Sequence, residues 1–135
     1  MASRLIISHR GQCVAAPEQT LAAYELTADL GAVMIEADLR FTRDGVPVML
    51  HDATVDRTTS GHGAVADLDW ADVAKLDAGS WFDIRFAEQR VPQLADLFDL
   101  AARRGVALCI EAKGQTGAEN ARVAVRNIRR EANEH

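Results

Sequence analysis

Short apolar runs alternate with longer amphipathic segments in the first part of the chain. Leu5–Ser8 is an apolar run of strand length that ends at the polar His9-Arg10-Gly11. Pro17-Glu18 then favours the start of a helix of about 14 residues, because proline is preset for the first turn and an acid there suits the helix dipole. Gly31 ends this helix, and Val33 begins a second apolar run. A strand, a helix and a strand in this order predict a βαβ unit with parallel strands.

The same alternation returns after the middle of the chain. Pro92 begins an amphipathic helix that ends at Gly105, and Val106–Ile110 predicts a third strand. Ala118–Arg130 has a further helical pattern, with basic residues late in the segment where the helix dipole favours them. Strands that alternate with helices of this length predict an α/β fold.

Two acids interrupt the second apolar run. Glu36 and Asp38 lie two positions apart, which places both carboxylates on one face of an extended chain. An apolar core has no use for such a pair, because an unpaired buried charge costs several kcal/mol. We therefore expect a cation or an anionic ligand next to this face.

A hairpin is predicted directly after these acids. Asp44-Gly45 is a dipeptide that readily forms a two-residue turn, and Val46–Leu50 returns as an extended run. A two-residue turn pairs Arg43 with Val46, and counting outward sets Asp38 directly opposite His51. Such cross-strand partners have Cβ atoms roughly 5 Å apart, so we expect an imidazole beside the two acids.

A long insertion separates the hairpin from the next helix. Residues 53–66 are polar and glycine-bearing, and Asp69 is expected to cap a short helix over Trp70–Leu76. Asp77–Gln89 is an aromatic-bearing loop without a clear period. An insertion of about 40 residues at this point usually covers a functional site. We interpret its side chains His62, Trp70, Trp81 and Phe82 as structural or surface residues.

Length and charge narrow the function classes. The chain has 135 residues, 48% of them hydrophobic and 26% charged, which is the composition of one modest globular domain. The net charge is −5 and the pI is near 5.3. These values argue against a general nucleic-acid binder, which needs a basic surface, but not against a local phosphate site.

Cysteines and hydropathy bear on the compartment. Cys13 and Cys109 are too few for a disulfide scaffold, so we expect reduced thiols unless the fold brings the two together. No apolar run approaches the ~18 residues of a membrane span, and Met1–Arg4 leads into a strand rather than a signal-peptide core. We therefore expect a cytoplasmic protein without a membrane span.

Ionisable residues follow or end each predicted strand and the hairpin return. In α/β folds the carboxyl ends of parallel strands form the ligand face, so these residues are expected to converge. They are His9, Arg10, Glu36, Asp38, His51, Asp52, Glu111 and Lys113. Three carboxylates on one face repel each other without a cation, and an oxygen-only ligand set favours Mg²⁺ or Ca²⁺ over zinc.

The remaining residues of this group suit chemistry at phosphorus. His9 and His51 can act as general acid and general base, because imidazole titrates near neutral pH. Arg10 and Lys113 supply positive charge for a phosphate, which arginine can bind in a bidentate manner. The combination indicates metal-assisted displacement at phosphorus.

Ordered motifs from His9 to Lys113 resemble the glycerophosphodiester phosphodiesterase family. They are HRG at residues 9–11, PEQTLAAYELTADLGA, IEADLRFTRDGVPVMLHD, DRTTSGHG, LDAGSWFD, VPQLADLFDLA and IEAK. The resemblance implies a TIM-type barrel that cleaves glycerophosphodiesters to an alcohol and glycerol 3-phosphate with a divalent cation. It also implies that residues 53–90 are the small subdomain that this family inserts in the barrel, within one domain over residues 1–135.

The resemblance implies a role for each site residue as well. His9 and His51 correspond to the acid–base pair, and Arg10 and Lys113 lie near the phosphate. The metal ligands are Glu36, Asp38 and Glu111. Two departures from the family pattern, Gln19 in place of asparagine and Gln93 in place of threonine, concern helix starts in this interpretation.

Length is the larger departure. A TIM barrel takes about 250 residues and eight βα units, whereas the sequence predicts roughly three strands and three helices before His135. We therefore expect the N-terminal part of a barrel. One alternative is a truncated, catalytically weak or inactive form that binds a metal or phosphate, or self-associates through exposed sheet edges. Another is an interaction module with a dead site, which a missing ligand or acid–base group would favour.

Each site residue also has an ordinary explanation when it is taken singly. His9 would be a satisfied polar residue at a strand end, Glu36 and Asp38 would be solvated acids, and Lys113 a surface lysine. The basic residues Arg126, Arg129 and Arg130 are most simply a solvated helix end. Only the group as a whole favours a functional interpretation.

Overall fold

The computed structural model describes residues 6–114 together with residues 125, 126 and 129. The elements in chain order are β1 (Ile7–His9), α1 (Leu21–Asp29), β2 (Met34–Phe41), β3 (Pro47–Met49), η1 (Val65–Asp67), α2 (Trp70–Val73), η2 (Ile84–Phe86), α3 (Leu94–Arg104) and β4 (Ala107–Ala112). Most of the helix predicted over residues 118–130 lies outside the described residues. Among the described residues, every helix is too short or too polar to cross a membrane.

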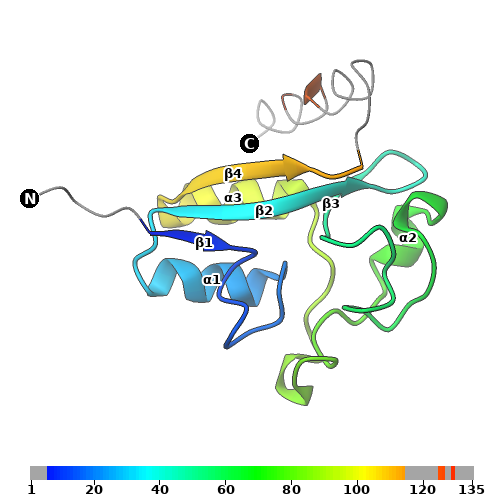
Figure 1. Cartoon of the computed structure of the whole chain (residues 1–135), viewed down its shortest axis with the longest axis horizontal. Coiled ribbons are helices and arrows are strands. Elements are labelled where there is room, and N and C mark those ends of the chain that lie inside the picture. The colour runs from blue at the N-terminus through cyan, green and yellow to red at the C-terminus, as the bar shows by residue number, and fades with distance from the viewer. Residues whose placement is uncertain (1–5, 115–124, 127–128, 130–135) are drawn as a thin grey trace, which may run out of the picture.

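Strand β2 is the centre of the sheet. Strands β1 and β4 pair with it in parallel, and β3 pairs with it antiparallel. Figure 1 shows the parallel strands pointing the same way, toward the side where residues 53–90 lie. The predicted α/β class with a parallel sheet is confirmed, and the ends of the parallel strands face the insertion.

The two faces of β2 have different surroundings. Ile35, Ala37 and Leu39 are fully buried beneath α1 and α3, against Tyr24, Met49, Leu94, Leu97 and Leu100. Because side chains alternate along a strand, Glu36 and Asp38 point to the opposite face. A second apolar cluster lies under the insertion and is formed by Val48, Leu50, Val55, Val65, Val73, Ala78 and Val91.

The hairpin register differs from the prediction by one residue. The loop has three residues, because Thr42 and Val46 form the closing pair and Gly45 adopts φ 82°. This is the common three-residue loop in which glycine takes the left-handed position. Consequently the Leu50 amide, and not His51, bonds the Asp38 carbonyl at 3.0 Å. The prediction that His51 lies directly opposite Asp38 is wrong.

The helices begin later than the prolines suggest. Helix α1 begins at Leu21, so it has 9 residues rather than about 14. The Thr20 hydroxyl oxygen caps it by accepting a hydrogen bond from the Ala23 amide. Helix α3 begins at Leu94, where the Asp96 carboxylate accepts a hydrogen bond of 2.8 Å from the Gln93 amide. Each proline therefore lies in the lead-in to its helix, outside the regular hydrogen bonding.

Helix α2 does not use the expected cap. Asp69 occupies the N-cap position but makes no side-chain capping bond, because its carboxylate pairs with Arg43 at 2.5 Å. The Trp70 amide instead donates to the carboxylate of Asp44 in the hairpin loop at 2.9 Å. Two hairpin residues therefore fix the start of α2 against the sheet.

Candidate active site

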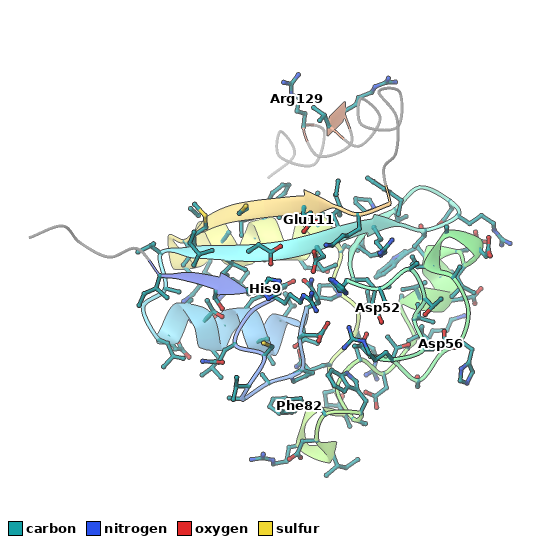
Figure 2. All side chains as sticks on the ribbon, in the orientation of Figure 1. His9, Asp52, Asp56, Phe82, Glu111 and Arg129 are labelled. Carbon is teal, nitrogen blue, oxygen red and sulfur yellow. The ribbon has the colours of Figure 1, made fainter. Side chains whose placement is uncertain are left out.

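The three predicted metal ligands converge at the ends of two adjacent parallel strands. Glu36 and Asp38 come from β2, and Glu111 comes from β4, where it pairs in register with Asp38. One oxygen from each carboxylate lies within 4.8 Å of the others. Figure 2 shows Glu111 and His9 on either side of β2. The spatial prediction for these three acids is confirmed, whereas their role as ligands remains a prediction.

Asp38 is the buried centre of this group, with none of its surface exposed. The Gln19 amide donates to its Oδ2 at 2.6 Å, and Arg10 Nε lies 3.3 Å from the same oxygen. Lys113 Nζ lies 3.3 Å from Oδ1. Two cationic groups and one amide therefore surround the carboxylate, as a buried charge requires.

Asp38 Oδ1 is suited to a metal ion. This oxygen is buried and accepts no hydrogen bond, although the Lys113 ammonium lies at ion-pair distance. A buried acceptor without a donor is uncommon in folded proteins. The neighbouring donors from Glu36 and Glu111 are also carboxylate oxygens, which hard cations prefer. The residues present thus fit a divalent cation such as Mg²⁺ or Ca²⁺.

The loop after β1 brings a cation to the same place. Arg10 has a φ of 59°, a conformation that is uncommon for residues other than glycine. Its amide donates to Glu36 Oε2 at 3.3 Å, and its guanidinium faces Asp38. His9 Nε2 lies 3.7 Å from Glu36 Oε2, and the His9 side chain is 67% exposed. Both residues adjoin the acids, as the convergence argument predicts.

Lys113 links the acids of β2 and β4. Its Nζ lies 2.7 Å from Glu111 Oε1 and 3.3 Å from Asp38 Oδ1. The hydrogen bond and the charge of Lys113 lower the pKa of Glu111. The hydrogen bond to Glu111 in turn raises the pKa of Lys113. Both groups are therefore charged at neutral pH.

His51 approaches the site from the end of the hairpin. Its Nδ1 lies 2.8 Å from Asp52 Oδ1, and its carbonyl accepts two hydrogen bonds from the Arg40 guanidinium at 2.7 and 2.9 Å. Asp52 is also bound by Arg57, and this hydrogen bond is the main cause of the lowered pKa of Asp52. His51 is thus held by both its backbone and its ring, despite the shifted register.

The sequence interpretation missed several residues of the site. Gln19 was assigned to a helix start, but Thr20 caps α1 and Gln19 instead holds Asp38, with its own carbonyl oxygen accepting from the Tyr24 hydroxyl. Arg57 bridges Glu18 and Asp52. Gln19 lies between the polar residues Glu18 and Thr20, so nothing in the local sequence marks it as a residue of the site. The Arg57 bridge spans 39 residues and has no local signal.

The side chains expected to be structural contact other residues of the insertion. His62 is at the surface beside Asp56, and Trp81, Phe82 and Phe86 stack edge to face within the insertion. Cys13 and Cys109 are free thiols, as predicted.

Comparisons with known proteins agree on one family. The model of the Glycerophosphoryl diester phosphodiesterase family matches residues 9–134. The glycerophosphodiester phosphodiesterase of Caldanaerobacter subterraneus subsp. tengcongensis is 44% identical over 109 residues, which are 81% of this chain and 45% of that protein. The mouse glycerophosphodiester phosphodiesterase 1 is 41% identical over 124 residues, 90% of this chain and 37% of that protein. The chain therefore spans less than half the length of these relatives.

Solved structures of the family have the same fold. A glycerophosphodiester phosphodiesterase from Agrobacterium tumefaciens superposes with a TM-score of 0.80 at 40% identity, over 93% of this chain and 54% of that one. A phosphodiesterase from Oleispira antarctica in complex with the product sn-glycerol-3-phosphate gives 0.79 at 34% identity, over 82% and 44%. These neighbours confirm the expected fold class, a part of a TIM-type barrel.

Proposed function

Because this chain belongs to the glycerophosphoryl diester phosphodiesterase family, we propose that its strand-end site hydrolyses glycerophosphodiesters to an alcohol and glycerol 3-phosphate with the help of a divalent cation. The observation that carries the proposal is the group of three carboxylate oxygens within 4.8 Å, with a buried Asp38 oxygen that accepts no hydrogen bond. We propose further that residues 1–135 form one partial barrel domain, with residues 53–90 as an insertion within it.

The acids and cations divide the work of binding. Glu36, Asp38 and Glu111 would hold Mg²⁺ or Ca²⁺, and the bound cation would offset negative charge that develops on the phosphate oxygens. Arg10 and Lys113 border the same carboxylates, so their cationic groups are within reach of a phosphate placed there. The substrate would therefore be bound through its phosphate.

The two histidines would move the protons. One imidazole would deprotonate the attacking group, which is a water or the neighbouring glycerol hydroxyl, and the other would protonate the leaving alcohol as its bond to phosphorus breaks. Attack by the hydroxyl would give a cyclic phosphate, which a water would then open to glycerol 3-phosphate. His9 lies beside Glu36 and His51 beside Asp52, so each ring has a carboxylate neighbour. Such a neighbour stabilises the imidazolium that forms when a ring accepts a proton.

Turnover of glycerophosphocholine, measured with and without added Mg²⁺ or Ca²⁺ and then with a chelator, tests the proposal. We expect activity that depends on the cation and is lost in His51→Ala. The matched control is His62→Ala, because His62 is exposed on the insertion and far in sequence from the acids. Turnover that resists chelation, or that is undiminished in His51→Ala, would contradict the proposal.

A second candidate function is binding of metal or phosphate without turnover, accompanied by self-association. It is favoured by exposure at both ends of the sheet: the side chain of Glu111 is 57% exposed at the site, and Ile6 and Ile7 are 61% and 56% exposed at the start of β1. Exposed apolar residues beside an open sheet favour association with another copy. Sedimentation together with metal titration separates the candidates, since a monomer that turns over substrate supports only the first.

A further inference from the structure

One arginine of the insertion connects two parts of the site that lie far apart in the sequence. Arg57 Nη1 and Nη2 donate to the Glu18 carboxylate at 3.0 and 2.8 Å. Arg57 Nε and Nη2 donate to the Asp52 carboxylate at 2.8 and 2.9 Å. The N–H donors of the planar guanidinium thus bind two carboxylates at once with two hydrogen bonds each, which the single ammonium group of a lysine cannot do. Figure 2 shows Asp52 on the side of the strand ends where the insertion begins.

The Asp52 carboxylate contacts His51, one of the two proposed acid–base histidines. Asp52 Oδ1 lies 2.8 Å from His51 Nδ1. Arg57 holds the pKa of Asp52 well below its ordinary value, so Asp52 is an ionised acceptor at neutral pH. An ionised carboxylate can only accept, which means that His51 Nδ1 carries the proton in this contact. The other ring nitrogen, Nε2, is then the one free to exchange a proton with a substrate.

The Glu18 carboxylate contacts Arg10, the arginine proposed to bind the phosphate. Glu18 Oε1 lies 3.4 Å from Arg10 Nη1, while Arg10 Nε faces Asp38. The side chain of Glu18 is only 12% exposed, so its position depends on its two arginine partners. A continuous chain of charge contacts therefore runs from His51 through Arg57 to Arg10 and on to Asp38.

We propose that Arg57 is a positioning residue of this site, which fixes the tautomer of His51 through Asp52 and the guanidinium of Arg10 through Glu18. The inference rests on the proposed function, because it assigns Arg57 to the same reaction. In this proposal the insertion also contributes to catalysis, because Arg57 at its start orients His51, the general acid or base. A purely structural tie between insertion and barrel would need the ion pairs but not a particular His51 tautomer.

The first test reads the tautomer directly. Two-dimensional ¹⁵N–¹H spectra of histidine-labelled protein distinguish a proton on Nδ1 from one on Nε2, and the His51 signal is assigned by its loss in His51→Gln. We expect neutral His51 to carry its proton on Nδ1 in the wild-type chain. In Asp52→Asn and Arg57→Lys we expect a mixture of tautomers. A His51 tautomer that is unchanged in both variants, or that has its proton on Nε2 in the wild type, overturns the inference.

The second test is kinetic and uses the same variants. We expect kcat to fall about 10- to 100-fold in Asp52→Asn and about 10-fold in Arg57→Lys, as is typical when a residue that orients a catalytic group is changed, with KM changed less than threefold in Asp52→Asn. We also expect the pH profile to shift in Asp52→Asn. The charged groups that act on His51 from its surroundings are Asp52, Arg57, Arg40, Glu18 and Glu111.

Arg85→Gln is the matched control, because Arg85 is also an arginine of the insertion but its ion partner among the described residues is Asp83, two positions away. We expect this variant to keep the wild-type tautomer, kcat and pH profile. Wild-type kinetics in both Asp52→Asn and Arg57→Lys overturn the inference. If the wild-type chain shows no turnover with any cation, the proposed function fails, and the tautomer measurement still decides the role of Arg57.

Discussion

The two faces of β2 show how one strand serves both stability and chemistry. Ile35, Ala37 and Leu39 point toward α1 and α3, and none of them is exposed. On the other face Asp38 is equally buried, but its neighbours are Arg10, Gln19 and Lys113 instead of apolar side chains. Burial alone therefore does not distinguish the core from the site. The difference lies in what surrounds each buried group.

This contrast separates the effects of substitution on the two faces. A change on the helix-covered face removes apolar contacts, so it lowers the free energy of unfolding. A change on the polar face removes one charge from a group of acids and cations, so it lowers cation binding and turnover per folded molecule, in addition to any stability lost when a buried charge loses its partner. The predictions below test this separation, in order of decreasing expected effect.

Asp38→Asn on the polar face is expected to have the largest effect. The amide keeps the shape of the side chain but loses the charge that Arg10 and Lys113 surround, and it replaces one ligand oxygen with a donor. We expect turnover to fall at least ~1000-fold, equivalent to about 4 kcal/mol of transition-state stabilisation. Cation-dependent turnover and calorimetric titration with Mg²⁺ or Ca²⁺ measure the loss.

The control for this variant is Asp72→Asn, since Asp72 is exposed on α2 and its ion partner among the described residues is the nearby Lys75. Its turnover is expected to match that of the wild type. Retention of more than a tenth of the activity in Asp38→Asn would mean that the three acids do not act as one metal site.

Leu39→Ala tests the opposite face of the same strand. Leu39 is fully buried among the side chains of α1, α3 and β3, so truncation leaves a cavity and costs about 3 kcal/mol of unfolding free energy. Because the side chain points away from the acids, kcat per folded molecule is expected to stay within about threefold. Urea denaturation and active-site-normalised turnover check the two parts separately.

Leu39→Met keeps nearly the same volume and is the matched control, with an expected cost below about 1.5 kcal/mol. If Leu39→Ala reduced kcat per folded molecule as strongly as Asp38→Asn, the two faces would not be separable.

The alternation along β2 was predictable because it is local. Glu36 and Asp38 interrupt an apolar run at a spacing of two, and this spacing alone assigns them to one face. The convergence of β2 with β4 followed from the general geometry of parallel strands, which brings Glu111 beside Asp38. Neither inference needed a long-range contact to be known in advance.

The register of the hairpin was not predictable at the same level. Asp44-Gly45 occurs both in two-residue turns and in three-residue loops, and the choice depends on how Thr42 closes the loop. The structure takes the longer loop, in which the Thr42 hydroxyl also binds Asp44 and the Val46 amide. One residue of difference was enough to put Leu50 in the place assigned to His51.

Contacts between distant segments were the least predictable part of the site. Gln19 reaches Asp38 across 19 positions, and Arg57 reaches Glu18 across 39. Each of these polar residues lies in a segment whose local pattern indicates only a helix approach or a loop. Their partners are fixed by the tertiary fold, so no spacing rule identifies them.

Gln19→Leu tests the support of the buried acid and is expected to have an intermediate effect. The substitution removes the 2.6 Å hydrogen bond to Asp38 Oδ2 and leaves the buried Tyr24 hydroxyl without its acceptor. We expect cation affinity to fall about 10- to 100-fold, the usual effect of losing a group that orients a metal ligand. Calorimetric titration with the cation measures the affinity.

Tyr24→Phe separates the two losses in this variant, because it removes the hydroxyl while Gln19 keeps its bond to Asp38. Its cation affinity is expected to stay within about threefold of the wild type. Gln12→Leu is a further control, since the hydrogen bond of the Gln12 side chain among the described residues is a local one, from the Val14 amide. Equal affinity in Gln19→Leu and the wild type would remove Gln19 from the site.

Arg57→Gln is expected to have the smallest effect on stability, and this effect depends on pH. Arg57 lowers the pKa of Asp52 and of Glu18 below their ordinary values of 3.8 and 4.5. A carboxyl group whose pKa is lower in the folded state stabilises the fold above its unfolded pKa, and this contribution is lost as the pH falls through the folded pKa. Because the Arg57 side chain is 45% exposed, solvent screens the pairs and the contribution at pH 7 is about 1 kcal/mol.

The unfolding free energies of Arg57→Gln and the wild type should therefore differ by about 1 kcal/mol at pH 7. They should approach each other below about pH 4, because the carboxylates of the unfolded chain bind protons there while the paired carboxylates of the folded chain stay ionised. Urea denaturation at pH 7, 5 and 3.5 measures this convergence, and Arg85→Gln should show little difference at pH 7. A gap between Arg57→Gln and the wild type that is constant across this range would assign the loss to packing of the Arg57 side chain. In that case Arg57 would stabilise the insertion through apolar packing, as Leu39 stabilises the core, and its charge would not lower the pKa of Asp52.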